Sequence, residues 1–189
     1  MLNFIFKSVF KLSGWKLVGS FPKNLKKSIV IVAPHADWTD FPIGLGGRAA
    51  IGVTMNFLGK EELFNGPFGW LFRWLGGFPV DRFNNNQMVD SVVNLFNSHD
   101  TLYIVLAPEG TRKGVSKLRT GFYFMAKKAN VPIMMVAFDY PKKEIRLSEP
   151  YALTHSIEDD LRQIAHYYNQ VSGVKKEWVG NYLNGIFNG

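Results

Sequence analysis

A histidine and a carboxylate stand five residues apart where the first strongly apolar run of the chain, residues 28–33, ends. If the turn after Pro34 leads into a helix, Asp40 can fold back onto one ring nitrogen of His35, fix the tautomer and raise the basicity of the other nitrogen. That nitrogen can then take a proton from an attacking hydroxyl, because an unperturbed pKa of roughly 6.5 suits a general base at neutral pH. Asp37 is an alternative partner, and a histidine that only satisfies its own loop is the structural alternative.

A second segment, residues 76–82 (GGFPVDR), combines a tight turn with a cation. Two adjacent glycines permit backbone angles that other residues avoid, and Pro79 fixes the path of the chain that follows. Arg82 presents a planar fork of N–H donors whose geometry suits a phosphate group. The segment therefore predicts an anion contact at Arg82, with a turn into an edge strand and a solvated arginine as the structural alternative.

A third segment follows the apolar run of residues 101–107 and reads Glu109, Gly110, Thr111 and Arg112. Gly110 lets the backbone approach a ligand closely, and the Arg112 guanidinium can bind phosphate. The Glu109 carboxylate can orient Arg112 or a hydroxyl of the substrate. Positive charge continues just downstream, at Lys113, Lys117 and Arg119. We therefore expect an anion site in this loop, and a solvated basic loop is the alternative interpretation of the segment on its own.

Short apolar runs of strand length alternate with segments of helical period along the chain. Strands are expected at residues 28–33, 52–57, 101–107, 132–138 and 144–147. Helices are expected at residues 2–12, 68–75, 87–97, 118–129 and 157–171. Strands that are apolar on both faces and alternate with helices predict an α/β fold: a single layered domain with a mostly parallel sheet flanked by helices, preceded by an N-terminal amphipathic helix. Sites in such sheets form beyond the carboxyl ends of the strands, where His35 and Glu109 stand.

The composition is that of a globular, basic chain rich in aromatic residues. Its 189 residues suffice for one domain, and a hydrophobic fraction of 47% excludes a disordered chain. The net charge of +7 favours a polyanionic partner. The basic residues are spread along the chain without a nucleic-acid-binding signature, so we expect no nucleic acid partner. The absence of cysteine removes disulfides and a cysteine nucleophile, and no cluster of metal ligands is evident, so no metal is expected.

The N-terminal segment is apolar but interrupted by lysines. Lys7 and Lys11 share one side of the expected helix, and apolar residues cover the other side. We find neither an uncharged apolar run of roughly 18 residues nor the pattern of a secretory signal. We therefore expect residues 1–18 to form a membrane-interfacial amphipathic segment of a protein that is peripheral to the cytoplasmic face of the cell membrane. Packing of this helix onto the domain as ordinary core is the alternative.

Taken together and in order, these segments resemble the glycerolipid acyltransferase family, which includes the lysophosphatidic acid acyltransferases. The resemblance rests on His35 with Asp40, on residues 76–82, on residues 109–112 (EGTR) and on residues 131–133 (VPI). It implies that His35 is the general base and that Asp40 orients it. It also implies a set of residues that bind the acceptor and its phosphate, namely Arg82, Glu109, Gly110, Thr111, Arg112 and Lys117.

The reaction implied by this resemblance moves a fatty acyl group from acyl-CoA or acyl carrier protein to the hydroxyl of a lysophospholipid such as 1-acyl-glycerol-3-phosphate. Residues 19–189 are then the acyltransferase domain, and the thioester is a co-substrate, with no cofactor needed. Direct transfer is expected, because the chain has no cysteine and no G-x-S-x-G turn. The alternatives are an O-acyltransferase acting on a lyso form of an amino-acid-containing lipid, a lipid or ester hydrolase, and a non-enzymatic peripheral lipid-binding module.

Overall fold

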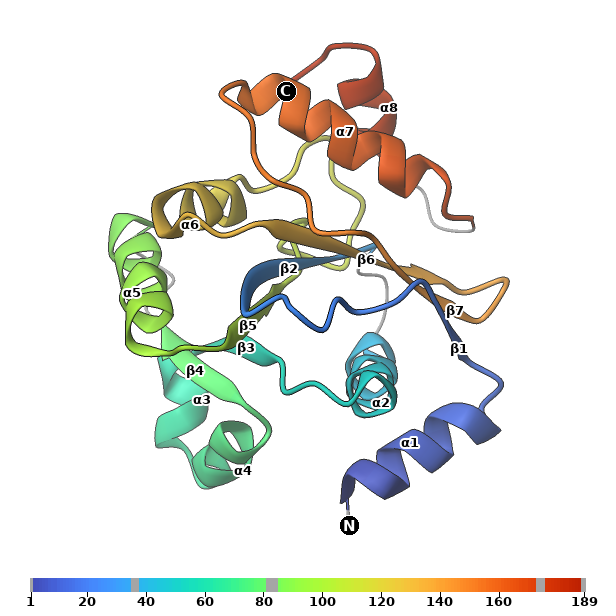
Figure 1. Ribbon diagram of the computed structural model, residues 1–189, viewed down its shortest axis with the longest axis vertical. Helices are drawn as coiled ribbons and strands as arrows, with labels where there is room; N and C mark the ends of the chain where they lie inside the picture. Colours follow the sequence, from blue (N-terminus) through green and yellow to red (C-terminus); the bar gives the residue numbers. More distant parts are fainter. Residues whose placement is uncertain (1, 35–37, 81–84, 173–175, 188–189) are drawn as a thin grey trace.

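Seven strands within the described residues form one sheet with helices on both faces (Figure 1). The structure is a computed structural model that describes residues 2–34, 38–80, 85–172 and 176–187. The strand order is β1-β7-β6-β2-β5-β3-β4, and every neighbouring pair is parallel except β6 with β7. The strands are β1 (Lys16–Val18), β2 (Lys27–Ala33), β3 (Asn56–Lys60), β4 (Gly77–Val80), β5 (Leu102–Leu106), β6 (Ile133–Asp139) and β7 (Glu144–Leu147). The expected α/β fold with a mostly parallel sheet is confirmed.

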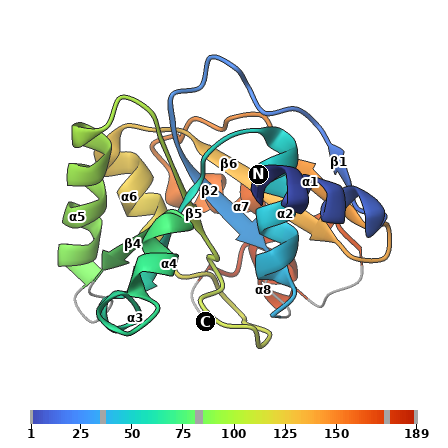
Figure 2. The same cartoon turned by 90° about the horizontal axis from the view of Figure 1, so that it is seen from below.

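The helices divide between the two faces of the sheet (Figures 1 and 2). One face is covered by α1 (Leu2–Leu12) and α2 (Asp40–Ile51). The other face is covered by α5 (Asn85–Ser98), α6 (Gly121–Ala129), α7 (Ile157–Asn169) and α8 (Glu177–Leu183). Two short helices, α3 (Glu61–Asn65) and α4 (Gly69–Trp74), pack beside β3 and β4.

The central strand β2 shows why the sequence favours this layered arrangement. Ile29 and Ile31 belong to the core under α5–α8, whereas Val30 belongs to the core under α1 and α2. Successive side chains of a strand point to opposite faces, so a continuous apolar run is buried on both sides. The register pairs Ile31 with Leu106 of β5, and the two parallel strands therefore end at the same edge of the sheet.

Helix α2 is rich in glycine, and tertiary packing explains why it forms. A Cβ atom on Gly46 would lie 2.9 Å from the Phe10 Cβ, and one on Gly47 would lie 2.5 Å from the Ile145 Cδ1. The two glycines therefore let α1 and β7 approach the α2 backbone closely. Asp40 is the first residue of α2, where a negative charge interacts favourably with the helix dipole.

The expected strand at residues 52–57 is wrong in its first half. Helix α2 continues to Ile51, and Gly52 ends it with a left-handed backbone at φ 78°. Strand β3 begins only at Asn56. A glycine that ends a helix in this conformation leaves the following residues outside the helix but not yet in the sheet.

The expected helix at residues 118–129 begins three residues late, at Gly121. The N–H of Leu118 donates to the Tyr182 hydroxyl at 2.8 Å, and the N–H of Arg119 donates to the Pro108 carbonyl at 2.8 Å. These bonds keep the segment before Gly121 in the loop that follows β5. Helix α8 was not expected from the sequence, and it supplies the Tyr182 hydroxyl that holds Leu118.

Candidate functional site

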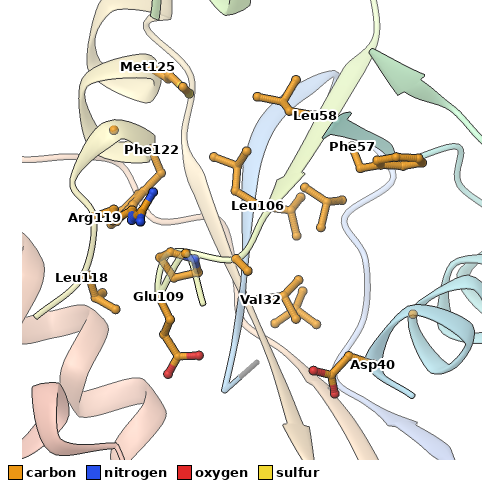
Figure 3. Close-up of a pocket in the computed structure, with 18 of the residues that line it drawn as sticks. Val32, Asp40, Phe57, Leu58, Leu106, Glu109, Leu118, Arg119, Phe122 and Met125 are labelled. Carbon is orange, nitrogen blue, oxygen red and sulfur yellow. The ribbon is translucent and has the colours of Figure 1, made fainter. Parts of the chain in front are cut away.

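A large cleft opens along the carboxyl edge of the sheet. Its volume is about 2230 Å³, well above the roughly 300–1,000 Å³ of a typical small-molecule pocket, so it has room for a long or composite ligand. Its walls include the start of α2, the ends of β3 and β5, and the loop over residues 107–120. Figure 3 shows Asp40 and Glu109 on opposite sides of apolar side chains that include Val32 and Leu106.

Asp40 lies at the wall formed by α2, and its carboxylate is held by another part of the chain. The residue is only 5% exposed, and the Tyr140 hydroxyl donates a hydrogen bond to its Oδ1. Tyr140 follows β6 and packs edge-on against the Trp15 ring, with centroids 5.3 Å apart. At least one contact that holds the Asp40 carboxylate therefore comes from outside the sequence motif. Tyr140 stands 100 residues from Asp40, and no local pattern indicates their contact.

Glu109 lies on the opposite wall and is also buried, at 7% exposure. Its Oε1 accepts a hydrogen bond of 3.0 Å from the Trp178 indole N–H, which comes from α8. The sequence assigned Glu109 the task of orienting Arg112 or a substrate hydroxyl, and that role stays a prediction. The contact with Trp178 was not foreseen, because it joins residues 69 positions apart.

Gly110 has a left-handed backbone and a close neighbour, and its predicted close approach to a ligand stays a prediction. Its φ is 67°, and a Cβ atom there would lie 2.5 Å from the Arg119 Nε. The neighbour that comes so close is thus the side chain of Arg119, which lies over Gly110 and lines the cleft (Figure 3). From the sequence, Arg119 was expected only to add charge. The structure places it directly beside the Glu109–Arg112 segment.

The remaining predicted residues of this loop also line the cleft. Arg112 and Lys117 are exposed, and the Thr111 Oγ1 accepts a hydrogen bond of 3.2 Å from the Lys113 N–H. Arg48 is a further cation of the cleft wall, but its Nη1 donates to the backbone carbonyls of Met55 and Leu75. Burial lowers the pKa of Arg48. The cations with exposed side chains in the cleft therefore lie on the loop after β5 and, at Lys127 and Lys128, on α6.

The structure brings six predicted site residues to one cleft, namely Asp40, Glu109, Gly110, Thr111, Arg112 and Lys117. His35, Asp37 and Arg82 lie outside the described residues, so the pairing of His35 with a carboxylate and the anion contact of Arg82 stay predictions. Across the residues that the structure describes, no group of three or more His, Cys, Asp or Glu side chains is arranged to hold a metal ion.

Comparison with known proteins places these features in a family. Residues 16–139, more than half of the chain, match the family model described as Acyltransferase. The chain belongs to the acyltransferase family. The matched region contains Asp40 and the whole loop over residues 107–120, and it ends at Asp139, before α7 and α8.

Two curated relatives share part of this acyltransferase. It is 32% identical over 120 residues to the 1-acyl-sn-glycerol-3-phosphate acyltransferase of Streptococcus pneumoniae (strain ATCC BAA-255 / R6), covering 62% of this chain and 44% of the relative. It is 30% identical over 102 residues to the 1-acyl-sn-glycerol-3-phosphate acyltransferase epsilon of Mus musculus, covering 51% of this chain and 28% of the relative. The alignments thus span less than half the length of these relatives.

A solved structure shares the fold of this acyltransferase. The crystal structure of the 1-acyl-sn-glycerophosphate (LPA) acyltransferase PlsC from Thermotoga maritima matches 89% of this chain and 75% of its own. The TM-score is 0.61 at 20% sequence identity. This likeness supports the α/β architecture described above.

Proposed function

We propose that this acyltransferase moves a fatty acyl group from a thioester, acyl-CoA or acyl carrier protein, to the free hydroxyl of 1-acyl-glycerol-3-phosphate or a similar lysophospholipid. The observation that carries the proposal is a single cleft with a buried carboxylate on one wall and exposed cations on another. Asp40 supplies the carboxylate, and the loop after β5 supplies Arg112, Lys117 and Arg119. The names of both curated relatives agree with this acceptor.

In the proposed mechanism His35 is the general base. Its imidazole takes the proton of the acceptor hydroxyl as the oxygen attacks the thioester carbonyl. Backbone N–H groups near the start of α2 stabilise the oxyanion that forms. The carbon–sulfur bond then breaks, and the imidazolium returns the proton to the leaving thiolate. Asp40, held by the Tyr140 hydroxyl, orients the imidazole and stabilises its charged form.

The cleft offers separate places for the two ends of the lipid. The exposed guanidinium groups of Arg112 and Arg119 bind the acceptor phosphate, assisted by Lys117 and Arg82. Apolar side chains on the central strands contact hydrocarbon, and each buried methylene group contributes about 0.8 kcal/mol. Figure 3 shows this apolar surface at Val32, Phe57, Leu58 and Leu106.

Replacing Arg112 with alanine is expected to raise the KM for 1-acyl-glycerol-3-phosphate roughly 10-fold, with a small effect on kcat, because a charge-assisted bond to phosphate is lost. Lys113→Ala is the matched control, since Lys113 is the adjacent exposed cation and is not among the residues that line the cleft. Steady-state kinetics with varied acceptor measures both variants. An equal rise in KM for the two would contradict a specific contact at Arg112.

We also propose that the protein works as a peripheral protein on the cytoplasmic face of the cell membrane, with residues 1–18 at the lipid interface. On α1, Phe10 packs against α2 at Gly46, whereas Val9 and Leu12 are 57% and 87% exposed. Helix α4 lies on the same side of the molecule (Figures 1 and 2) and exposes Trp70 and Trp74. Such a surface suits an interfacial helix, and the positive charge suits the anionic cytoplasmic leaflet. None of the described helices has the length and apolar character needed to span a bilayer.

The double substitution Val9→Ser and Leu12→Ser is expected to lower binding to anionic liposomes roughly 10-fold or more, because two exposed apolar side chains leave the interface. Ile186→Ser is the control: Ile186 is 51% exposed and follows α8, which lies on the opposite side of the molecule from α1 (Figure 1). Flotation of the purified proteins measures binding. Undiminished flotation of the double variant would contradict the interfacial role of α1. The two substitutions leave Phe10 in place, so α1 is expected to stay packed on the domain.

An acceptor screen with one labelled acyl thioester tests the proposed substrate. We expect the highest kcat/KM with 1-acyl-glycerol-3-phosphate and much lower values with lyso lipids that have no phosphate. A preference for a lyso amino-acid-containing lipid would keep the acyl transfer and overturn the acceptor. Binding of lipid without consumption of thioester would favour a non-enzymatic lipid-binding module.

A further inference from the structure

The short C-terminal helix α8 is bonded directly to the loop that carries the EGTR residues. The backbone N–H of Trp178 donates to the Val115 carbonyl at 3.2 Å, and the Asn181 side-chain amide donates to the Ser116 carbonyl at 2.8 Å. The Leu118 N–H donates to the Tyr182 hydroxyl at 2.8 Å. With the bond from the Trp178 indole to Glu109, these contacts join α8 to both ends of the loop segment that starts at Glu109.

Trp178 itself is fixed by the core beneath it. Its side chain is fully buried, and its ring packs edge-on against Tyr168 of α7, with centroids 5.6 Å apart. The Lys176 ammonium, just before α8, donates to the Tyr168 carbonyl at 2.7 Å. Burial lowers the pKa of Lys176, and the charges of Asp139 and Glu109 partly offset that effect. The indole N–H thus projects from a rigid base toward a carboxylate at the edge of the cleft.

We propose that Trp178 is a positioning residue for the acceptor site. Its indole N–H holds the Glu109 carboxylate in one rotamer at the cleft. The other hydrogen bonds of α8 hold the cation-bearing loop in a fixed position relative to Glu109. This inference rests on the proposed function, in which that loop binds the acceptor. Helix α8 lies beyond the region that matches the family model, which ends at Asp139, so the match assigns no role to Trp178.

The variant Trp178→Phe tests this role, because phenylalanine keeps a buried aromatic ring and removes the N–H donor. A hydrogen bond to a charged group is worth enough that its loss corresponds to roughly a 10-fold change or more. We expect the KM for 1-acyl-glycerol-3-phosphate to rise roughly 10-fold, with kcat changed less than about threefold. A change confined to kcat, or no change in either constant, would overturn the proposal.

Tyr151→Phe is the matched control for lost stability. It also removes an aromatic donor to a buried carboxylate, since the Tyr151 hydroxyl donates to the Asp160 Oδ1 at 2.7 Å, but neither residue lines the cleft. Both variants are expected to lower Tm, and only Trp178→Phe is expected to raise the acceptor KM. An equal rise in KM for Tyr151→Phe would overturn the proposal, because destabilisation alone would then explain the effect.

A double-variant cycle tests whether Trp178 acts through Glu109. In the Glu109→Ala background, Trp178→Phe is expected to add less than twofold to KM, whereas fully additive effects would overturn the proposal.

The NMR resonance of the Trp178 indole N–H, one of five tryptophan indoles in this chain, gives a readout that needs no activity. It is assigned with Trp178→Phe and is expected to move in Glu109→Ala; an unmoved resonance would overturn the proposal. Absence of turnover in the unaltered protein would instead count against the proposed function, and the resonance would still decide whether Trp178 holds Glu109.

Discussion

Replacing His35 with alanine is expected to lower kcat by roughly 10²–10⁴-fold, the usual contribution of a general base. The acceptor hydroxyl is a weak nucleophile until its proton is removed, and in the proposed mechanism no other group takes that proton. The KM for the acceptor is expected to change little, because binding is assigned to the loop after β5. Initial rates with saturating thioester and acceptor measure the effect.

The exposed His155 offers a matched control for this substitution, since His155→Ala removes an imidazole that does not line the cleft. Its kcat is expected to stay within about twofold of the unaltered protein. Liposome flotation and Tm are expected to be unchanged in both variants. Near-normal turnover by His35→Ala would show that His35 is not the general base.

Replacing Asp40 with asparagine is expected to lower kcat by roughly 10²-fold or more, since the amide keeps the size of the side chain but loses the charge that stabilises an imidazolium. The effect on the acceptor KM is expected to be small. Tyr140→Phe keeps the carboxylate and removes the hydroxyl that donates to its Oδ1. We expect a smaller loss of kcat there, roughly 3- to 10-fold, from a less fixed carboxylate. Rapid assays of thiol release measure both variants.

A double variant separates the role of Asp40 from a general loss of structure. If Asp40 acts only through His35, adding Asp40→Asn to His35→Ala is expected to change kcat little further. Full additivity of the two losses would show that Asp40 acts elsewhere. A large fall in Tm for Asp40→Asn alone would also contradict the account, because the loss of activity would then follow from unfolding of α2.

The strands of the central sheet are predictable from the sequence, and the helix that carries Asp40 is less so. Residues 29–33 and 133–138 are apolar at every position, as strands buried on both faces must be, and β2 and β6 form there. Helix α2 contains Gly44, Gly46 and Gly47, which lower helix propensity, and packing of β6, α1 and β7 against these glycines compensates for that. Short elements such as β1 and α8 carry too few residues for a period to be read.

The motif predicts that Glu109 and Arg112 lie in the loop after β5. It does not predict the side chains that contact Asp40 and Glu109. Tyr140 and Trp178 reach Asp40 and Glu109 only after the chain has folded, across 100 and 69 residues of sequence. The preference for Lys117 over Arg119 as the downstream cation came from the motif alone. In the folded chain the Arg119 side chain lies beside Gly110, whose backbone is left-handed, and the backbone N–H of Arg119 donates to the Pro108 carbonyl.

The most direct test of the account is the ratio of acylated lipid to released thiol when the purified protein is given labelled acyl thioester and 1-acyl-glycerol-3-phosphate. We predict a ratio near one, with thiol release that depends on the acceptor. Thiol release accompanied by free fatty acid, with or without the acceptor, would show that water takes the acyl group and would contradict acyl transfer to a lipid hydroxyl.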